Sequence, residues 1–179
     1  AEAVAAVEGG YRAFAGSDLF AQARTIVRLV EERDQPDAER LSGYHASDMP
    51  SIERRLGSTA PIYPFMEIDR IESHLAFSAE VLGADHPLVV RMLGGKSPRD
   101  RAIELVEGSN LADPSFRVQL VESGKDAVLS SDDSLIRFAL AIDPIARMYR
   151  AQMEDEVEAV ERDAYARIAA ARFSVYGQA

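Results

Sequence analysis

The three histidines, His45, His74 and His86, are the first residues to consider for acid–base or metal chemistry. Imidazole titrates near neutral pH and binds transition metals, so two histidines three or four residues apart on a helix would form a pair of ligands. None of the three has a second histidine at either spacing, and His86 directly precedes Pro87, which is typical of a helix start. We therefore expect no catalytic or metal-binding histidine.

The segment LGGKS at residues 93–97 has part of the pattern of a phosphate-binding loop. That pattern requires a glycine five residues before the glycine next to the lysine, and Val90 occupies this position. The residues before the segment are predicted to form a helix rather than a strand, and Pro98 follows it. We expect no nucleotide here and no cofactor elsewhere.

An acidic run near the C-terminal end could in principle bind a hard cation. It consists of Glu154, Asp155, Glu156, Glu158 and Glu161. On a helix these carboxylates would point in many directions, with Arg150 and Arg162 among them. A calcium site needs a loop, and inward-facing carboxylates need partners on neighbouring helices. We predict a solvated, ion-paired face and no metal site.

Nucleophilic catalysis by serine has no local signal in this sequence. No serine has the glycine-flanked turn that exposes a nucleophile at the end of a strand. Ser123 stands next to Gly124, but at a predicted helix end, where glycine is common. The sequence therefore predicts no catalytic, cofactor-binding or metal-ligating residue, and the chain by itself is expected to be inert as an enzyme.

The composition is that of a folded globular protein, with 179 residues, 47% hydrophobic, and a net charge of −10. The negative charge argues against nucleic acid and anionic membranes as partners. The absence of cysteine excludes disulfides and zinc–thiolate sites. No apolar run reaches the roughly 18 residues that span a bilayer. The start, AEAVAAVEGG, does not resemble a signal peptide, which excludes an uncleaved precursor and leaves a mature secreted protein open.

Apolar spacing of three and four residues predicts helices almost throughout the chain. Residues 1–14 are expected to end one helix, and Ser17 or Asp18 to cap the next, which Pro36 ends. This second helix should bury Leu19, Ala23, Ile26, Val27 and Val30. Further helices are expected at residues 36–43, 50–57 and 65–82, the last with a stripe of Ile68, Ile71, Leu75 and Leu82.

The second half of the sequence repeats a polar residue followed by proline. Ser97, Asp113 and Asp143 are each expected to cap a helix that has proline at its first position. The last of these helices should run from Pro144 to about Phe173, roughly 45 Å. Its apolar residues recur about every 3.67 positions, and we expect the shorter helices to support the whole stripe. The stripe consists of Tyr149, Met153, Val157, Val160, Ala164, Ile168 and Ala171. RFSVYG, at residues 172–177, looks like the beginning of a β-strand.

These patterns predict an all-α fold, an irregular bundle of short helices packed along one long C-terminal helix. Most aromatic residues occupy stripe positions and are expected to form core: Phe65, Phe77, Tyr149, Tyr165 and Phe173. Tyr63 lies between Ile62 and Pro64 in an extended connector, where it could instead face a partner.

Several segments, in this order, resemble the helical domain of the bacterial dipeptidyl-peptidase 7 and 11 family of serine exopeptidases. They are TIVRLVEERDQPDAERLSGY, APIYP, LGADHPLV, ELVEGSNLADPSFR and the stretch from Asp143 to Gly177, which is the most specific. The resemblance covers residues 19–177. It implies a periplasmic or cell-surface protein in which a chymotrypsin-like double β-barrel carries the serine, histidine and aspartate.

The resemblance further implies that residues 1–173 are a helical cap domain and that residues 174–179 begin the connection to that barrel. The cap would cover the cleft and restrict it to peptide N-termini, so the expected partners are the barrel and a peptide substrate. No catalytic residue of the family has a matching position here. Asn110 lies in a different motif from the family's amine-binding asparagine, so that role is not transferred to it.

The residues alone leave a second interpretation open, a free-standing acidic helical module that binds another protein. In both interpretations, exposed apolar residues bind another protein surface. A domain that packs against a neighbour should expose an apolar patch where that neighbour binds, and a patch of more than a few hundred Å² is unusual for a monomer.

Overall fold

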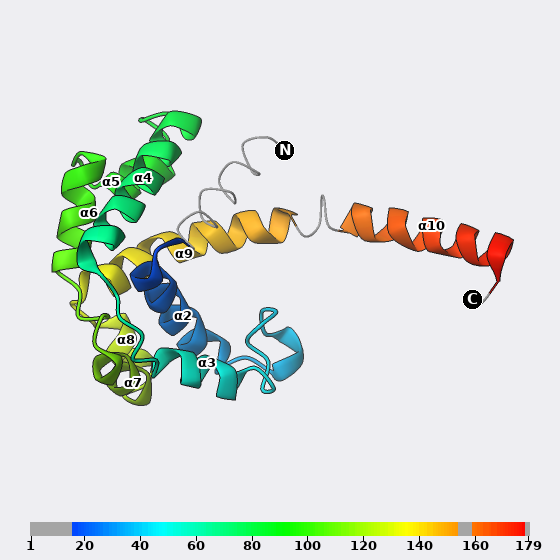
Figure 1. Cartoon of the computed structure of the whole chain (residues 1–179), viewed down its shortest axis with the longest axis horizontal. Helices are drawn as coiled ribbons and strands as arrows, with labels where there is room; N and C mark the ends of the chain where they lie inside the picture. Colours follow the sequence, from blue (N-terminus) through cyan, green and yellow to red (C-terminus); the bar gives the residue numbers. More distant parts are fainter. Residues whose placement is uncertain (1–15, 154–158, 178–179) are drawn as a thin grey trace.

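The computed structural model describes residues 16–153 and 159–177, and every regular element in these ranges is a helix (Figure 1). The long helices are α2 (Asp18–Glu32), α4 (Pro64–Leu82), α9 (Ser134–Met153) and α10 (Ala159–Tyr176). The shorter elements are a 3₁₀ turn (Asp37–Glu39), α3 (Met49–Leu56), α5 (Pro87–Leu93), α6 (Pro98–Glu107), α7 (Pro114–Glu122) and α8 (Lys125–Leu129). The predicted all-α fold is confirmed for the described residues; the helix expected over residues 1–14 lies outside them.

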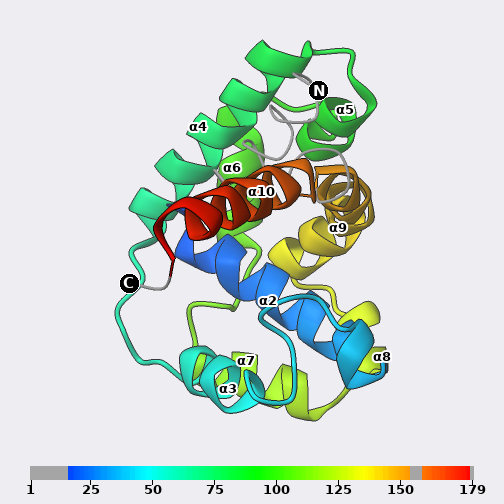
Figure 2. The same ribbon diagram turned by 90° about the vertical axis from the view of Figure 1, so that its right-hand side faces the viewer.

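Helices α2 and α9 pack against each other in the middle of the body. Helices α4, α5 and α6 lie at one end, and α3, α7 and α8 at the other (Figures 1 and 2). The rings of Phe20 and Phe138 meet edge to face between α2 and α9, with centroids 5.7 Å apart. The predicted apolar face of α2 is buried at every position: Leu19, Ala23, Ile26, Val27 and Val30. These residues all belong to the hydrophobic core.

Three predicted helix caps are confirmed. The side-chain oxygens of Ser17, Ser97 and Asp113 accept hydrogen bonds from backbone amides in the first turns of α2, α6 and α7. Proline follows the cap directly in α6 and α7, where its missing N–H leaves no donor unsatisfied. These short helices therefore begin where local chemistry alone would place their starts.

The predicted helix start at Asp143 and Pro144 is wrong. Helix α9 begins ten positions earlier, at Ser134, and Pro144 lies inside it. A proline within a helix costs about 3 kcal/mol, because position 144 has no N–H for the carbonyl four residues back. The preceding turns of α9 bury several apolar side chains, the larger of them worth about 1.5–3 kcal/mol each, and this burial outweighs the cost. These residues are Leu135, Ile136, Phe138, Ala139 and Ile142.

The helix predicted over residues 36–43 is also wrong in length, because only the 3₁₀ turn forms there. Here backbone amides donate to side-chain carboxylates instead of to the carbonyl oxygens of a helix. Glu32 accepts from the amide of Leu41 at 2.8 Å, and Asp37 accepts from that of Ala46 at 2.6 Å. The short helix α8 was not expected from the sequence; it follows Gly124, whose φ of 85° breaks the chain direction after α7.

Helix α10 differs most from expectation. It continues to Tyr176, and Gly177 follows with φ 69°, so the β-strand expected at residues 172–177 is wrong. It stands apart from the other helices (Figure 1), and its described side chains are exposed throughout. The expected support of the C-terminal stripe is therefore wrong from Val160 to Ala171. The side chains of Tyr149 and Met153, and residues 154–158, lie outside what the structure describes.

Candidate functional site

The three histidines lie on separate elements, and each contacts its local surroundings. His86 is the N-cap of α5, with its Nδ1 accepting from the amide of Leu88 at 3.2 Å, as expected for a helix start. The His45 Nδ1 lies 2.8 Å from the carbonyl oxygen of Asp37, and the His45 amide donates to the carboxylate of Asp48 at 3.0 Å. His74 lies on α4. The structure does not bring these residues together.

The LGGKS segment joins two helices. Gly94 ends α5 in the left-handed conformation with φ 58°, and Ser97 caps α6. The ammonium of Lys96 lies 2.9 Å from a carboxylate oxygen of Glu104. The predicted helix before this segment is confirmed, and the lysine and serine have structural partners.

The acidic run falls mainly outside the described residues: Glu154, Asp155, Glu156 and Glu158 are not described, and Glu161 is exposed on α10. Ser123 ends α7, and its hydroxyl donates to the carbonyl of Gln119 at 2.8 Å. Within residues 16–153 and 159–177, no group of three or more acidic or histidine side chains could hold a metal ion. In that same part of the chain, no helix has the length and apolarity to cross a membrane.

His74 is half buried, and burial lowers its pKa below the ordinary value of 6.5. The unfolded chain then binds the proton more tightly than the folded chain, so stability is greatest above pH 6.5 and falls as the pH drops towards the folded pKa. We expect His74→Gln to reduce the fall in the free energy of unfolding between pH 7.5 and 5. Urea titrations at several pH values measure it, with His45→Gln as control. Parallel curves for wild type and His74→Gln would contradict the prediction.

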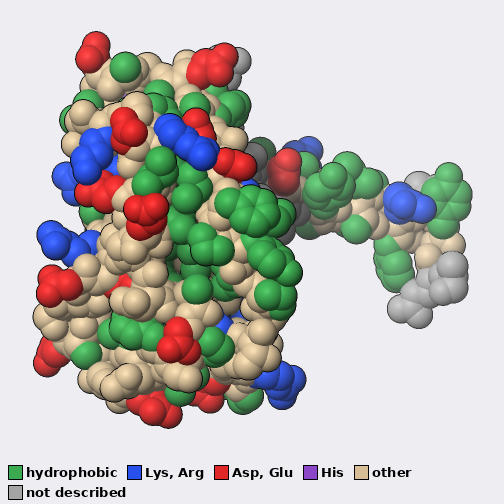
Figure 3. Space-filling model, turned by 60° about the vertical axis from the view of Figure 1, so that its left-hand side comes forward, with side chains coloured by type: hydrophobic (Ala, Val, Ile, Leu, Met, Phe, Trp, Pro, Cys, Tyr) green, Lys and Arg blue, Asp and Glu red, His purple; other side chains and the backbone are tan. Residues whose placement is uncertain are grey.

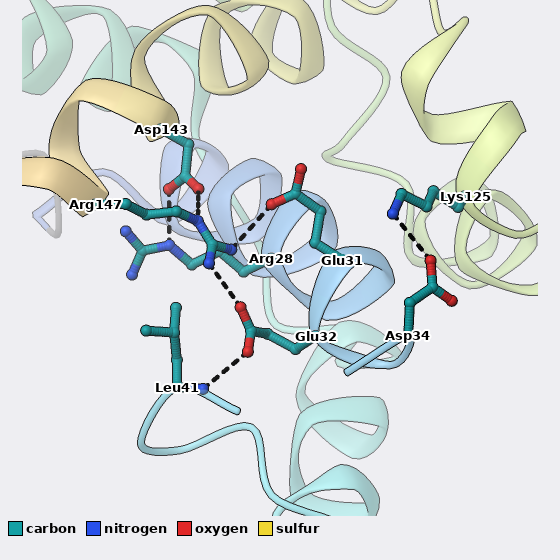
Figure 4. A network of polar contacts seen from close by, with 8 residues as sticks. All are labelled: Arg28, Glu31, Glu32, Asp34, Leu41, Lys125, Asp143 and Arg147. Atoms are coloured by element: carbon teal, nitrogen blue, oxygen red, sulfur yellow. Dashed lines mark hydrogen bonds and ion pairs between the residues drawn. The ribbon is translucent and has the colours of Figure 1, made fainter. Parts of the chain in front are cut away.

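A network of ionic contacts joins α2 to α9 (Figure 4). The two carboxylate oxygens of Asp143 accept from Nε of Arg28 at 2.7 Å and Nε of Arg147 at 2.6 Å. Arg147 Nη1 donates to Glu32 at 2.6 Å, and its Nη2 lies 3.1 Å from Glu31. Burial alone would lower the pKa of Arg147, but the hydrogen bonds to Asp143 and Glu32 raise it above its ordinary value. Asp143, predicted to be a helix cap, therefore connects two helices instead.

The start of α2 is held by a buried carboxylate from α4. Glu67 accepts from the Ser17 hydroxyl at 2.6 Å and from the Leu19 amide at 2.9 Å, and Arg70 donates to it at 2.8 Å. A carboxylate at a helix N-terminus is favoured by the free amide hydrogens and by the helix dipole. This contact fixes α4 against α2.

The connector before α4 is held by Arg117, which is 1% exposed. Its guanidinium donates to the carbonyl of Leu56 at 2.7 Å, to that of Leu111 at 2.6 Å, and to that of Ser58. The bonds to Leu56 and Ser58 fix the end of α3 and the beginning of the connector that leads to Tyr63.

Two aromatic residues, Tyr63 and Phe65, stand on the surface where this connector enters α4. Tyr63 is 53% exposed and Phe65 is 65% exposed, and their ring centroids are 6.1 Å apart. Met66 beside them is also exposed. The prediction that Phe65 forms core is wrong, and the same holds for Phe77, Tyr165 and Phe173, all of which are exposed. We call Tyr63, Phe65 and Met66 the aromatic corner.

Helix α10 carries further exposed apolar side chains. They are Val160, Tyr165, Ile168, Phe173 and Tyr176. Figure 3 shows hydrophobic side chains along this projecting helix and gathered in the middle of one face of the body. Such surface apolarity is typical of a domain that packs against another protein surface.

The described part of the chain is thus a helical domain with exposed apolar surfaces. The peptidase S46 model matches residues 5–179. The chain belongs to the peptidase S46 family, the dipeptidyl-peptidase 7 and 11 family of serine peptidases. The resemblance seen in the sequence is confirmed at the level of the family.

Proposed function

We propose that this chain is the helical cap of a serine dipeptidyl-peptidase. In this proposal the catalytic serine, histidine and aspartate lie in a β-barrel, and the helices cover the cleft so that it admits only peptide N-termini. The chain itself releases no dipeptides. Lids of this kind act by limiting access and by separating the reaction from bulk water. A periplasmic or cell-surface location belongs to the same proposal.

The observation that carries the proposal is the exposure of the aromatic corner and α10 in a chain of this family. Large aromatic side chains are enriched where protein surfaces bind each other, and they contribute most when a partner buries them fully. The aromatic corner is also held in place, because Arg117 fixes the connector on one side and Glu67 fixes the first turn of α4 on the other. A fixed aromatic corner loses little entropy on binding.

The test joins this chain to the catalytic barrel of a peptidase S46 relative and measures dipeptide release from a long peptide with a free N-terminus. We expect the joined protein to release dipeptides and to reject the same peptide with a blocked N-terminus, whereas the isolated chain is inactive. Tyr63→Ser with Phe65→Ser should weaken the association of separately supplied cap and barrel by about a hundredfold, or about 2.7 kcal/mol.

Leu129→Ser is the matched control, because Leu129 is an exposed apolar residue on α8, at the other end of the body. It should leave the association unchanged. Dipeptide release by the isolated chain, or equal cleavage of free and blocked peptides by the joined protein, would refute the cap. Tight binding of an unrelated protein by the isolated chain, with no binding to the barrel, would favour the free interaction module.

A further inference from the structure

One face of α4 is only half covered by the described part of the chain. At about 100° per residue, Glu67, Arg70, His74, Phe77 and Val81 lie within about 80° of the helix circumference. They form one continuous stripe along the helix, which we call the α4 stripe. Its first half carries polar residues and its second half carries Phe77 and Val81.

The first half of the α4 stripe binds the chain around the start of α2. Arg70 donates to the carboxylate of Asp18 at 3.1 Å, and Glu67 accepts from the hydroxyl of Ser17 at 2.6 Å. A Cβ at Gly16 would lie 3.4 Å from Nε2 of His74. Traced backwards from residue 18 to residue 16, the chain therefore moves along α4 from Arg70 to His74, towards the C-terminal end of the helix.

The second half of the α4 stripe follows His74 in the same direction along the helix. Phe77 is 47% exposed and Val81 is 44% exposed. Along the helix they are about 4.5 Å and 10.5 Å beyond His74, at 1.5 Å per residue. Phe77 and Val81 are thus exposed on the same face of α4 whose earlier turns contact residues 16–18.

The segment before Gly16 has the residues to cover them. Tyr11 and Phe14 are three positions apart, and Val4 and Val7 precede them at the same spacing. Five residues span at most about 18 Å when extended and about 7.5 Å as a helix. Tyr11 can therefore reach Val81, since about 10.5 Å falls between these limits. Phe14, two residues before Gly16, spans about 3–7 Å and can reach Phe77 at about 4.5 Å, so neither contact depends on one backbone conformation.

We propose that residues 1–15 pack along the second half of the α4 stripe, with Tyr11 and Phe14 covering Phe77 and Val81. The start of the chain then extends the contact between α2 and α4 to the far end of α4. The inference does not depend on the cap proposal. It also narrows that proposal, because it leaves the aromatic corner and α10 as the apolar surfaces for another protein.

The absence of cysteine allows a direct test. Arg12→Cys combined with Glu80→Cys places one thiol in the segment and one beside Val81 on the exposed side of α4. A short thiol-specific cross-linker should join them within one molecule, detected as a shifted monomer band and by the mass of the linked peptides. Arg12→Cys with Asp132→Cys, whose position before α9 is fully exposed, is the control pair and should not cross-link.

Adding Phe77→Ser and Val81→Ser to the first pair should lower the cross-linking yield about tenfold. Val90→Ser, at an exposed apolar position on α5, should not lower it. Because Phe77 and Val81 are exposed, their variants retain the helical fold, which circular dichroism checks. Cross-linked dimers in place of cross-linked monomers would mean that a second copy of the chain covers the α4 stripe, which would also overturn the proposal. Equal yields for both cysteine pairs, no cross-link at all, or no effect of the serine variants would each overturn the proposal.

Discussion

Replacing Arg117 with alanine is expected to lower the free energy of unfolding by about 3–5 kcal/mol. The guanidinium is buried and donates to four carbonyl oxygens, those of Leu56, Leu111, Ala112 and Ser58. Burial lowers the pKa of Arg117. Alanine would leave the carbonyls without donors in a place that water reaches poorly, and it would open a large cavity between α3 and α7. Urea unfolding followed by circular dichroism measures the change.

The matched control is Arg54→Ala, which removes an exposed arginine from α3 and should change stability by less than about 0.5 kcal/mol. Arg117→Lys should recover little, because an ammonium group presents its donors from one point and cannot reach carbonyls in three directions. If Arg117→Ala were as mild as Arg54→Ala, the carbonyls would have to be satisfied by water, and the role given to Arg117 would be wrong. A selective loss of association with the barrel in Arg117→Lys would support its role in positioning the aromatic corner.

Replacing Asp133 with alanine is expected to destabilise the chain by about 2–4 kcal/mol. Its buried carboxylate caps α9 by accepting from the amides of Leu135 and Ile136, each at 3.1 Å. It also accepts from the Asn110 amide at 2.7 Å and the Ser109 hydroxyl at 3.0 Å. One side chain thus caps α9 and binds the loop between α6 and α7, so its removal leaves several donors unsatisfied at once.

Asp132→Ala provides the control for Asp133, because the neighbouring side chain is fully exposed and has the same charge. We expect a change within about 0.5 kcal/mol for Asp132→Ala. Asp133→Asn should be intermediate, because one amide oxygen remains to accept while the charge is lost. Equal effects at positions 132 and 133 would mean that net charge, rather than the cap, determines the loss. Thermal unfolding of the three variants at one pH distinguishes these cases.

Where helices begin could be predicted from the sequence only when local chemistry and packing agree. The Ser97–Pro98 and Asp113–Pro114 pairs begin helices as expected. Asp143–Pro144 has the same local pattern but lies within α9, because the turns before it are buried against α2 and its carboxylate binds Arg28 and Arg147. Local residues cannot reveal those partners, of which Arg28 is 115 positions away.

Which apolar faces are buried could be predicted for α2 and for the face of α4 that carries Ile71 and Leu75, but not for the aromatic residues of α4 or for α10. Periodicity shows that a helix has an apolar side, but it does not show what covers that side. The face of α2 is enclosed by several helices, whereas Phe65, Tyr165 and Phe173 are exposed. These three aromatic residues, wrongly predicted to be buried, are therefore among the exposed residues on which the proposed function rests.

The contacts that hold the aromatic corner had no signal in the sequence. Glu67 and Ser17 are separated by 50 residues, and Arg117 and Leu56 by 61. Glutamate and arginine on a predicted helix are normally assigned to its solvent side, because their burial is costly unless partners are present. Only the tertiary structure reveals the partners that make burial of these two residues favourable.

The packing of α2 against α9 has a consequence during synthesis of the chain. Their contacts join positions 115 residues apart, so the apolar face of α2 leaves the ribosome well before the helix that covers it. At about 5–20 residues per second, the delay is roughly 6–23 s. During this time the nascent chain presents Phe20, Ile26 and Val27 without their final partner. Binding by a holdase chaperone should therefore be strongest for ribosome-bound chains that end before α9, and it should decline sharply once Phe138 and Ile142 have emerged.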